Sequence, residues 1–287
     1  MEQLERYRVM VEDYLKTHLS QKPAYGSLIE AMNYSLLAGG KRLRPVLTLA
    51  VCEMCGGRAE QVLPFACGVE MVHTYSLIHD DLPCMDDDDL RRGKPTSHKV
   101  FGEAMAVLAG DALLTGAFES LSQAELPPER VVQAVQCLAS CAGCAGMVGG
   151  QVLDMDGEGH ALSRQELETL QSLKTGALIQ AAAELGCIGA GGSQAQRQAV
   201  AHYAQCLGRA FQIQDDILDV VSTSEALGKP VGSDVANDKS TFVGLLGLEE
   251  CRALVQQLTQ EAVEALAMFP NRECLVTIAQ QMAQRTH

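Results

Sequence analysis

Two groups of aspartates in this 287-residue chain follow apolar, helix-like segments, and their residue types and spacing suit the binding of divalent metal ions. The first group lies in HDDLPCMDDDD, residues 79–89, and the second lies in QIQDDILD, residues 212–219. Clustered carboxylate oxygens are the hard ligands that Mg²⁺ prefers. We therefore predict that the metal ligands are Asp80, Asp81, Asp86, Asp215, Asp216 and Asp219.

The spacing within each group sets a different requirement on the backbone. Asp215 and Asp219 lie on one helix face, where like charges repel unless cations lie between them. Asp80 and Asp86 are six residues apart, which on a continuous helix turns them away from each other by about 240°. Pro83 disfavours helical backbone at the residue before it. We therefore expect a bend after Asp80 that returns Asp86 towards it.

Basic residues follow both aspartate groups and a glycine turn near the N-terminus. They are Arg91 and Arg92 after the first group, Lys229 and Lys239 after the second, and Lys41, Arg42 and Arg44 in GGKRLRP. Arginine forks and magnesium ions are the two common means of binding a diphosphate. Two acidic groups with separate basic groups predict that two diphosphates are held side by side.

Composition limits the class of protein. A formal net charge of -14 argues against nucleic-acid binding, and 47% hydrophobic residues indicate a globular chain. No run of about 20 uninterrupted apolar residues predicts a membrane span, and the N-terminus has no apolar signal core. Eleven cysteines, an odd count, fit a reducing compartment, so we expect the cytoplasm. The C-x-x-C pairs Cys52/Cys55 and Cys141/Cys144 lie in helix-like runs, which favours structural thiols over zinc.

The apolar pattern repeats with a period close to 3.6 residues almost throughout, and alternating strand-like segments are absent. This predicts an all-α fold, with one helical domain over residues 1–287. Glycine or proline marks the breaks that we expect between helices. They are Gly39-Gly40, Gly56-Gly57, Arg92 to Pro95, Leu126 to Pro128, Asp156 to Gly159, Gly189 to Ser193 and Gly228 to Lys239.

Taken together, the motifs resemble those of the trans-isoprenyl diphosphate synthase (polyprenyl synthetase) family, in order from about residue 30 to 245. The matching segments are GGKRLRP (39–45), Asp80-Asp81-x4-Asp86 with Arg91-Arg92-Gly93, Lys174-Thr175, and Phe211-Gln212-x-x-Asp215-Asp216-x-x-Asp219 with Lys229. The resemblance implies a helical bundle around a large central cavity, usually a homodimer. It also implies a prenyltransferase that joins isopentenyl diphosphate to an allylic diphosphate, with three Mg²⁺ ions per site.

The resemblance also implies a role for each matching residue. Magnesium ions bridging the two aspartate groups would hold the allylic diphosphate, together with Arg91, Lys174, Lys229 and Lys239. Isopentenyl diphosphate would lie on Lys41, Arg44, His73 and Arg92. Thr175, Gln212 and the Lys174 carbonyl would shield the allylic cation, and the released diphosphate would take up the final proton. Gln151 and Asp154 would support the metal-binding groups from behind.

Product length is predicted from the helix that precedes the first aspartate group. Tyr75 lies five residues before Asp80, roughly 7.5 Å along the helix, where a ring would form a floor for the growing chain. An aromatic residue there, with the longer motif DDLPCMD, resembles bacterial-type farnesyl diphosphate synthases, so we expect the C15 product. Ser76 beside it is small, and HDDLPCMD with RRGKPTSHKVFGE also resembles C20 synthases, which stay as the alternative.

Two rival classes fit the sequence less well. A terpene cyclase of the same fold would carry an Asn-Asp-x-x-Ser/Thr-x-x-x-Glu motif, but the segment beginning at Asn237 ends in Leu245. A noncatalytic subunit of a heteromeric synthase would be expected to lack one aspartate group, whereas both are complete. The C-terminal QQMAQRTH has Arg285 as its only arginine, which weakens the expectation that a basic tail closes the site.

Overall fold

The computed structural model describes residues 2–18, 24–221 and 240–285 of the chain. The all-α prediction is confirmed, because apart from one two-residue hairpin, β1 (Leu90–Arg91) and β2 (Lys94–Pro95), the regular elements in these ranges are helical. The α-helices are α1 (Glu2–His18), α2 (Gly26–Leu36), α3 (Leu43–Met54), α4 (Leu63–Asp80), α5 (Ser97–Phe101), α6 (Glu103–Ser122), α7 (Pro128–Ala142), α8 (Met147–Asp156), α9 (Arg164–Gln171), α10 (Ala177–Ala190), α11 (Gln194–Val221), α14 (Phe242–Leu246), α15 (Leu248–Ala265) and α16 (Glu273–Gln284). A short 3₁₀ helix, η1 (Ala59–Val62), precedes α4, and a π-helix, η2 (Ser172–Gly176), joins α9 to α10.

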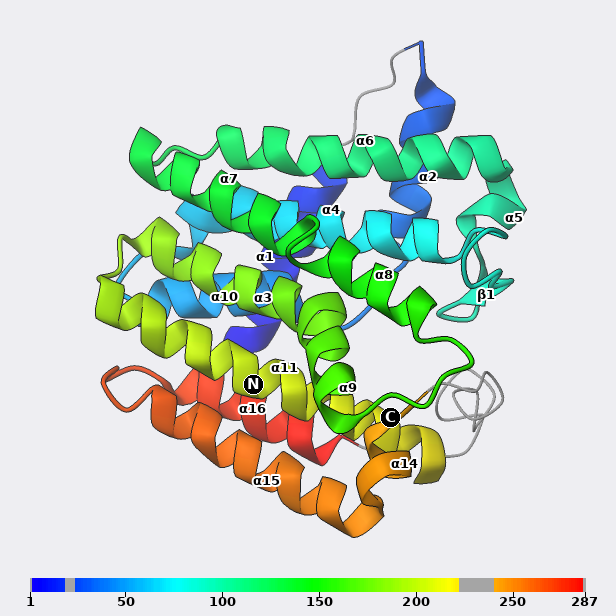
Figure 1. Cartoon of the computed structure of the whole chain (residues 1–287). Helices are drawn as coiled ribbons and strands as arrows, with labels where there is room; N and C mark the ends of the chain where they lie inside the picture. The colour runs from blue at the N-terminus through cyan, green and yellow to red at the C-terminus, as the bar shows by residue number, and fades with distance from the viewer. Residues whose placement is uncertain (1, 19–23, 222–239, 286–287) are drawn as a thin grey trace.

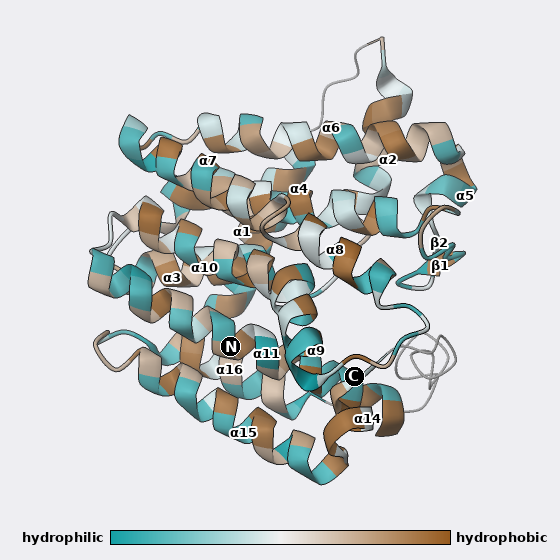
Figure 2. Ribbon diagram, viewed as in Figure 1, coloured by the Kyte–Doolittle hydropathy of each residue, from teal (hydrophilic) through white to brown (hydrophobic). Residues whose placement is uncertain are grey.

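The helices are stacked so that α4 and α10 lie inside the bundle (Figure 1). Both helices bury most of their side chains, which explains why their sequences are apolar on nearly every face. The outer helices are polar on their solvent side (Figure 2). Buried apolar side chains form one continuous cluster that runs from Leu4 on α1 to Met282 on α16. The C-terminal end of α4, the hairpin, the end of α8 and α14 lie on one side of the bundle, at the right in Figure 1.

Several predicted breaks coincide with ends of helices. Gly39 and Gly40 have positive φ angles between α2 and α3, and Gly191 ends α10 with a φ of 75°. The sequence analysis missed the hairpin, whose tight turn uses positive φ at Arg92 and Gly93. It also missed the π-helix, because a one-residue widening of a helix leaves no mark in the apolar period.

Two segments have the length and composition of membrane-spanning helices, namely Glu103–Ser122 and Pro128–Asp156. The first is α6, which packs along α4 in the core, and core helices of soluble bundles pass the same test. The second is interrupted between α7 and α8. These segments are weak grounds for a membrane span.

Arg42 joins four helices at the turn before α3. It has a φ of 48° and is 3% exposed. Its Nε donates to Glu12 on α1 at 2.6 Å, its Nη1 donates to buried Glu70 on α4 at 2.9 Å, and its Nη2 donates to the Leu36 carbonyl at the end of α2. This basic residue of GGKRLRP therefore fixes the turn, and its neighbours Lys41 and Arg44 are left to face the cavity described below.

Replacing Glu70 with Gln should test the contribution of this ion pair. We expect the free energy of unfolding to fall by about 3 kcal/mol, because the buried Arg42 loses a charged partner. Urea denaturation followed by circular dichroism measures the change. Glu60→Gln is the matched control: Glu60 pairs with Arg6 at 3.4 Å with both side chains about half exposed, so its loss should cost less than about 1 kcal/mol. Equal effects of the two substitutions would contradict the structural role of Glu70.

Candidate active site

The first aspartate group begins where α4 ends. The backbone N–H of Asp86 donates to the carbonyl of Asp80 at 2.9 Å, which confirms the predicted bend after Pro83. Asp81 is buried and its carboxylate accepts from Nε of Arg91 on the hairpin at 2.6 Å. The hairpin therefore holds Asp81, while Asp86 stays exposed on the outer side of the bend.

The carboxylate of Asp80 accepts no hydrogen bond from the described part of the chain. Burial raises its pKa to about 6; Lys174 opposes this shift and Asp86 adds to it. These influences put Lys174 and Asp86 close to Asp80. A carboxylate whose negative charge is incompletely balanced, and which lies beside a second carboxylate, is well suited to bind a cation.

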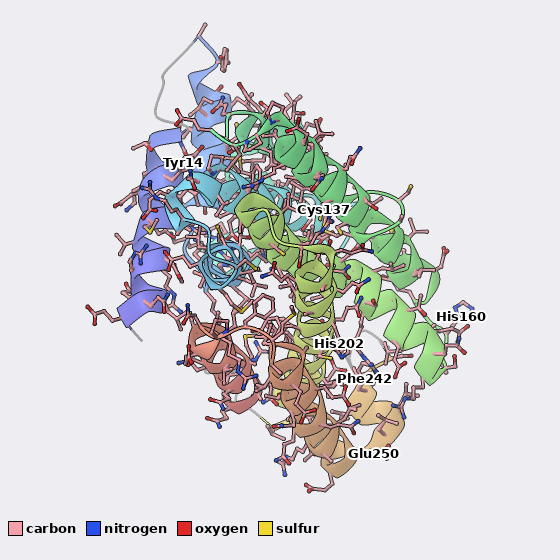
Figure 3. All side chains as sticks on the ribbon, turned by 90° about the vertical axis from the view of Figure 1, so that its left-hand side faces the viewer. Tyr14, Cys137, His160, His202, Phe242 and Glu250 are labelled. Carbon is pink, nitrogen blue, oxygen red and sulfur yellow. The ribbon has the colours of Figure 1, made fainter. Side chains whose placement is uncertain are left out.

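The second aspartate group lies near the end of α11, and its members differ in depth. Asp216 and Asp219 are buried, whereas the side chain of Asp215 is 42% exposed. Asp216 accepts from the backbone N–H of Phe242 at 2.7 Å and from Gln212 at 3.4 Å. It therefore ties the start of α14 to α11, and Figure 3 shows Phe242 beside that helix. Asp215 is thus the more exposed of the two adjacent aspartates, whereas Asp216 lines the smaller cavity described next.

Lys174, Thr175 and Gln212 line one cavity of about 170 Å³, together with Asp154 and Asp216. Asp216 brings the second aspartate group to this cavity, and Lys174 is close enough to Asp80 to lower its pKa. The three residues predicted to bind and shield the reacting allylic carbon are thus brought to one place. Lys229 and Lys239, predicted to bind the same diphosphate, fall outside the described residues.

The π-helix positions Lys174, whose Nζ pairs with Asp154 on α8 at 2.6 Å. π-Helical turns are frequent at functional sites, where they redirect a side chain or a carbonyl. Gly150 allows α8 to approach, since a Cβ at this position would lie 2.2 Å from the Lys174 nitrogen. Asp154 therefore supports Lys174, and Gln151 lies half-buried next to Gly150; their predicted support of the metal-binding groups stays a prediction.

Lys41, Arg44, His73 and Arg92 line a second, larger cavity of about 720 Å³. They come from the start of α3, the middle of α4 and the hairpin turn. Burial holds the pKa of His73 well below its usual range, and the guanidinium groups of Arg44 and Arg92 lower it further. His73 is therefore a neutral hydrogen-bonding group among cations. The predicted isopentenyl diphosphate residues thus form one basic cavity.

The glycine pair before α3 places Arg92. The guanidinium of Arg92 donates to the Gly39 carbonyl and lies over Gly40, where a Cβ would be 2.7 Å from its central carbon. Gly40 has a φ of 124°, a conformation that side chains other than glycine rarely adopt. The motif GGKRLRP therefore places Lys41 and Arg44 at the cavity, and its glycines support Arg92.

Arg285, at the C-terminal end of α16, also lines the larger cavity and was not among the predicted site residues. It pairs with Asp215, donates to the Phe211 carbonyl at 3.0 Å, and lies 4.2 Å from the centre of the Phe211 ring. The tail therefore does reach the site, although it has a single arginine. A sequence pattern gives no sign of this contact, because it joins segments 70 residues apart in the chain.

The residues fit magnesium that is shared with a diphosphate. No cluster of three or more potential ligands from His, Cys, Asp or Glu occurs within residues 2–18, 24–221 and 240–285. Mg²⁺ typically takes one or two protein carboxylates and completes its shell with phosphate oxygens and water. Asp80 and Asp86 on one side and Asp215 on the other provide that kind of partial set.

The profile of the polyprenyl synthetase family matches residues 26–272. The chain belongs to this family. The large subunit 1 of a heterodimeric geranylgeranyl pyrophosphate synthase from the chloroplast of Arabidopsis thaliana is 51% identical over 265 residues, covering 89% of this chain and 71% of that protein. Geranylgeranyl pyrophosphate synthetase from Pyrococcus horikoshii has a TM-score of 0.90 at 30% identity and covers 99% of this chain and 98% of that one. An FPP/GFPP synthase from Zymomonas mobilis has a TM-score of 0.87 at 38% identity, covering 98% and 97%.

These comparisons correct the product that we expected from the sequence. The farnesyl reading is wrong, because relatives of this polyprenyl synthetase from Arabidopsis thaliana, Capsicum annuum and Catharanthus roseus are named geranylgeranyl pyrophosphate synthases. They are also named as chloroplast proteins, a location that differs from the cytoplasm predicted here.

The surroundings of Tyr75, the predicted floor for the growing chain, are set by its neighbours on α4. The ring is 7% exposed and packs edge-on against His79 at 5.6 Å, and His79 in turn bonds to the Val107 carbonyl on α6. Ser76 turns back to its own helix and donates to the His73 carbonyl at 3.0 Å. Tyr75 is thus part of the packing between α4 and α6, and neither it nor Ser76 lines the two cavities described above.

Replacing Asp80 with Asn should stabilise the metal-free protein. Because its pKa is about 6 in the fold and near 3.9 when unfolded, the ionised carboxylate costs stability that begins near pH 4 and is complete above pH 6. We expect Asp80→Asn to raise the free energy of unfolding by roughly 1–2 kcal/mol at pH 8 in EDTA, and by less at pH 5. Urea denaturation at both pH values measures this.

Asp87→Asn is the control for this experiment, since Asp87 lies in the same loop and is exposed. It should change stability by less than about 0.5 kcal/mol at either pH. A loss of stability in Asp80→Asn at pH 8, or the same gain at both pH values, would contradict the environment described for Asp80.

Proposed function

We propose that this polyprenyl synthetase is a geranylgeranyl diphosphate synthase, which condenses isopentenyl diphosphate head-to-tail with allylic diphosphates up to C20. The observation that carries this proposal is the closeness of two cavities: a basic one that reaches Phe211 on α11, and a second one, lined by Lys174, Thr175, Gln212 and Asp216, that begins at the next residue of the same helix. The names of relatives with about half of their aligned residues identical support the C20 product.

We assign the allylic diphosphate to the space between Asp80, Asp86 and Asp215. Three Mg²⁺ ions per site would neutralise the negative charge that grows on the leaving diphosphate. Lys174 and Arg91 lie at this space and add fixed positive charge next to the same oxygens. Breakage of the allylic C–O bond is favoured there because the cations stabilise the departing diphosphate more than they stabilise the intact substrate.

Isopentenyl diphosphate is assigned to the 720 Å³ cavity, with its diphosphate on Lys41, Arg44 and Arg92. Its double bond attacks the allylic cation, and the new C–C bond replaces the broken C–O bond. Thr175 and Gln212 face the cation with neutral oxygens, and the Lys174 carbonyl adds a third. The proton lost from the condensed intermediate goes to the released diphosphate, so no protein base is needed. Lys229 and Lys239 stay as predicted ligands of the allylic diphosphate.

As assembly we propose a homodimer of single-domain subunits in an aqueous compartment, without a membrane span. The chain has an unpartnered apolar surface on α8, where Val148, Val152 and Met155 recur on one helix face at 44–51% exposure. Leu108 on α6 is also exposed, at 53%. A second copy of this chain would cover such a surface. The cytoplasm and the chloroplast of the named relatives both provide the aqueous compartment.

Product analysis is the experiment that tests the function. The purified protein is incubated with Mg²⁺, labelled isopentenyl diphosphate and, in separate reactions, C5, C10 or C15 allylic diphosphate. We expect elongation of all three starters to C20. Asp80→Ala and Asp215→Ala, as controls, should lower turnover by orders of magnitude in folded protein. Elongation that stops at C15 would overturn the C20 product and retain the enzyme class, whereas no condensation with any starter would favour a noncatalytic subunit.

Tyr75→Ala tests the predicted floor for the growing chain. Loss of the ring opens space beside α4, the helix that carries Asp80, so we expect products longer than those of the unchanged enzyme. Tyr75→Phe keeps the ring and should leave the product length as it was. Chromatography of the dephosphorylated products measures both. Identical products from Tyr75→Ala and the unchanged enzyme would remove Tyr75 as a determinant of length.

A further inference from the structure

Arg285, at the end of α16, joins the second aspartate group to the large basic cavity. Its guanidinium pairs with Asp215, the open member of the second aspartate group, and also lines the large basic cavity. The contact is supported on both sides: the Arg285 carbonyl accepts from Gln214 at 3.1 Å, and the guanidinium lies over the Phe211 ring. One residue of the tail thus touches the predicted metal ligand and the predicted isopentenyl diphosphate site.

The Arg285 side chain is held in place, yet one of its hydrogen-bond donors is not used. It is 11% exposed, and its Nε is buried without a hydrogen-bond partner. Nε of Arg44, across the same cavity, is also buried without one. A buried donor without an acceptor is costly, and it is satisfied when an anion enters the space that it faces. The two unsatisfied guanidinium nitrogens therefore point to an oxygen-rich anion in this cavity.

Charge is balanced in an unusual way at Asp215. Lys41 lies close enough that Asp215 raises its pKa, while burial and Arg285 lower it. In the described part of the chain the Asp215 carboxylate therefore has two cations near it: Arg285 is in direct contact and Lys41 lies at longer range. Any further cation that approaches this carboxylate meets positive charge already in place.

We propose that Arg285 acts as a positioning residue that couples metal binding at Asp215 to anion binding in the basic cavity. Without metal, Arg285 is the counter-ion of Asp215. When a divalent ion takes that carboxylate, Arg285 releases it and turns its donors to the diphosphate on Lys41 and Arg44. Binding of each ligand then favours binding of the other, because the Arg285–Asp215 ion pair opposes both. The inference rests on the proposed function for the identity of the two ligands, but its test needs no turnover.

Metal binding without substrate is the first test. Electron paramagnetic resonance of free Mn²⁺ measures how much ion the protein takes up. We expect Arg285→Gln to bind Mn²⁺ about fivefold more tightly than the unchanged protein, since the competing cation is gone. Arg285→Lys keeps the charge and should gain less. In an Asp215→Asn background the substitution at 285 should have no effect, which assigns the gain to this pair.

Arg252→Gln is the matched control for net charge. Arg252 pairs with Glu249 on the surface of α15 and is half exposed. Its replacement by Gln removes one positive charge, as Arg285→Gln does, but at a site outside both cavities. It should leave Mn²⁺ binding unchanged. Equal Mn²⁺ affinity in Arg285→Gln and the unchanged protein, with folding verified by circular dichroism, would overturn the proposal.

Anion binding in EDTA is the second, reciprocal test. Because Asp215 holds Arg285 in the metal-free protein, Asp215→Asn should bind isopentenyl diphosphate about fivefold more tightly by calorimetry. The gain should vanish in the Asp215→Asn, Arg285→Gln double variant. A gain that persists in the double variant would mean that Asp215 acts only by repulsion, and Arg285 would then have no coupling role. A failure of catalysis with both binding results intact would overturn the proposed function and leave this coupling standing.

Discussion

The need to balance the charge of carboxylates around the two cavities determines how this part of the molecule is built. Asp81 is paired with Arg91, Asp154 with Lys174 and Asp215 with Arg285. Each of these cations lies on a different element from its aspartate. They come from the hairpin, the π-helix and the tail. The pairs therefore fold these elements against the ends of α4, α8 and α11. The same cations are the groups proposed to face diphosphates, so the charge that organises the metal-free site is also the charge assigned to substrate binding.

A rigid bundle is required for this arrangement, because ion pairs of this kind hold only when the backbone fixes both partners. Close helix packing provides it. A Cβ at Gly186 on α10 would lie 2.3 Å from the Thr48 carbonyl on α3, and Gly110 on α6 leaves room for the His79 ring from α4. Small residues in these helices therefore set the distance between helix axes. The close approach at Gly110 fixes the end of α4 in this way, and with it the first aspartate group.

Much of the site could be predicted from the sequence because its motifs are local. The spacing around Pro83 determined the return of Asp86 towards Asp80, and the helical period determined the all-α fold. Contacts between distant segments left no such signal. The pairing of Arg285 with Asp215 depends on where α16 ends relative to α11, and the hydrogen bond from Phe242 to Asp216 depends on the entry of α14. The different depths of Asp215 and Asp216 likewise follow from packing around α11 and not from their adjacent places in the chain.

The error over product length has the same origin and shows how a local motif can mislead. Tyr75 precedes Asp80 by the distance that a floor would need, yet a helix residue has neighbours on every side. Its ring lies against His79, and His79 is fixed by the Val107 carbonyl and by the space at Gly110. The aromatic ring is therefore linked to α6 through His79. A predicted floor at Tyr75 consequently depends on the packing of two helices, so that substitutions on α6 beside His79, at Gly110 above all, test it as directly as substitutions at Tyr75.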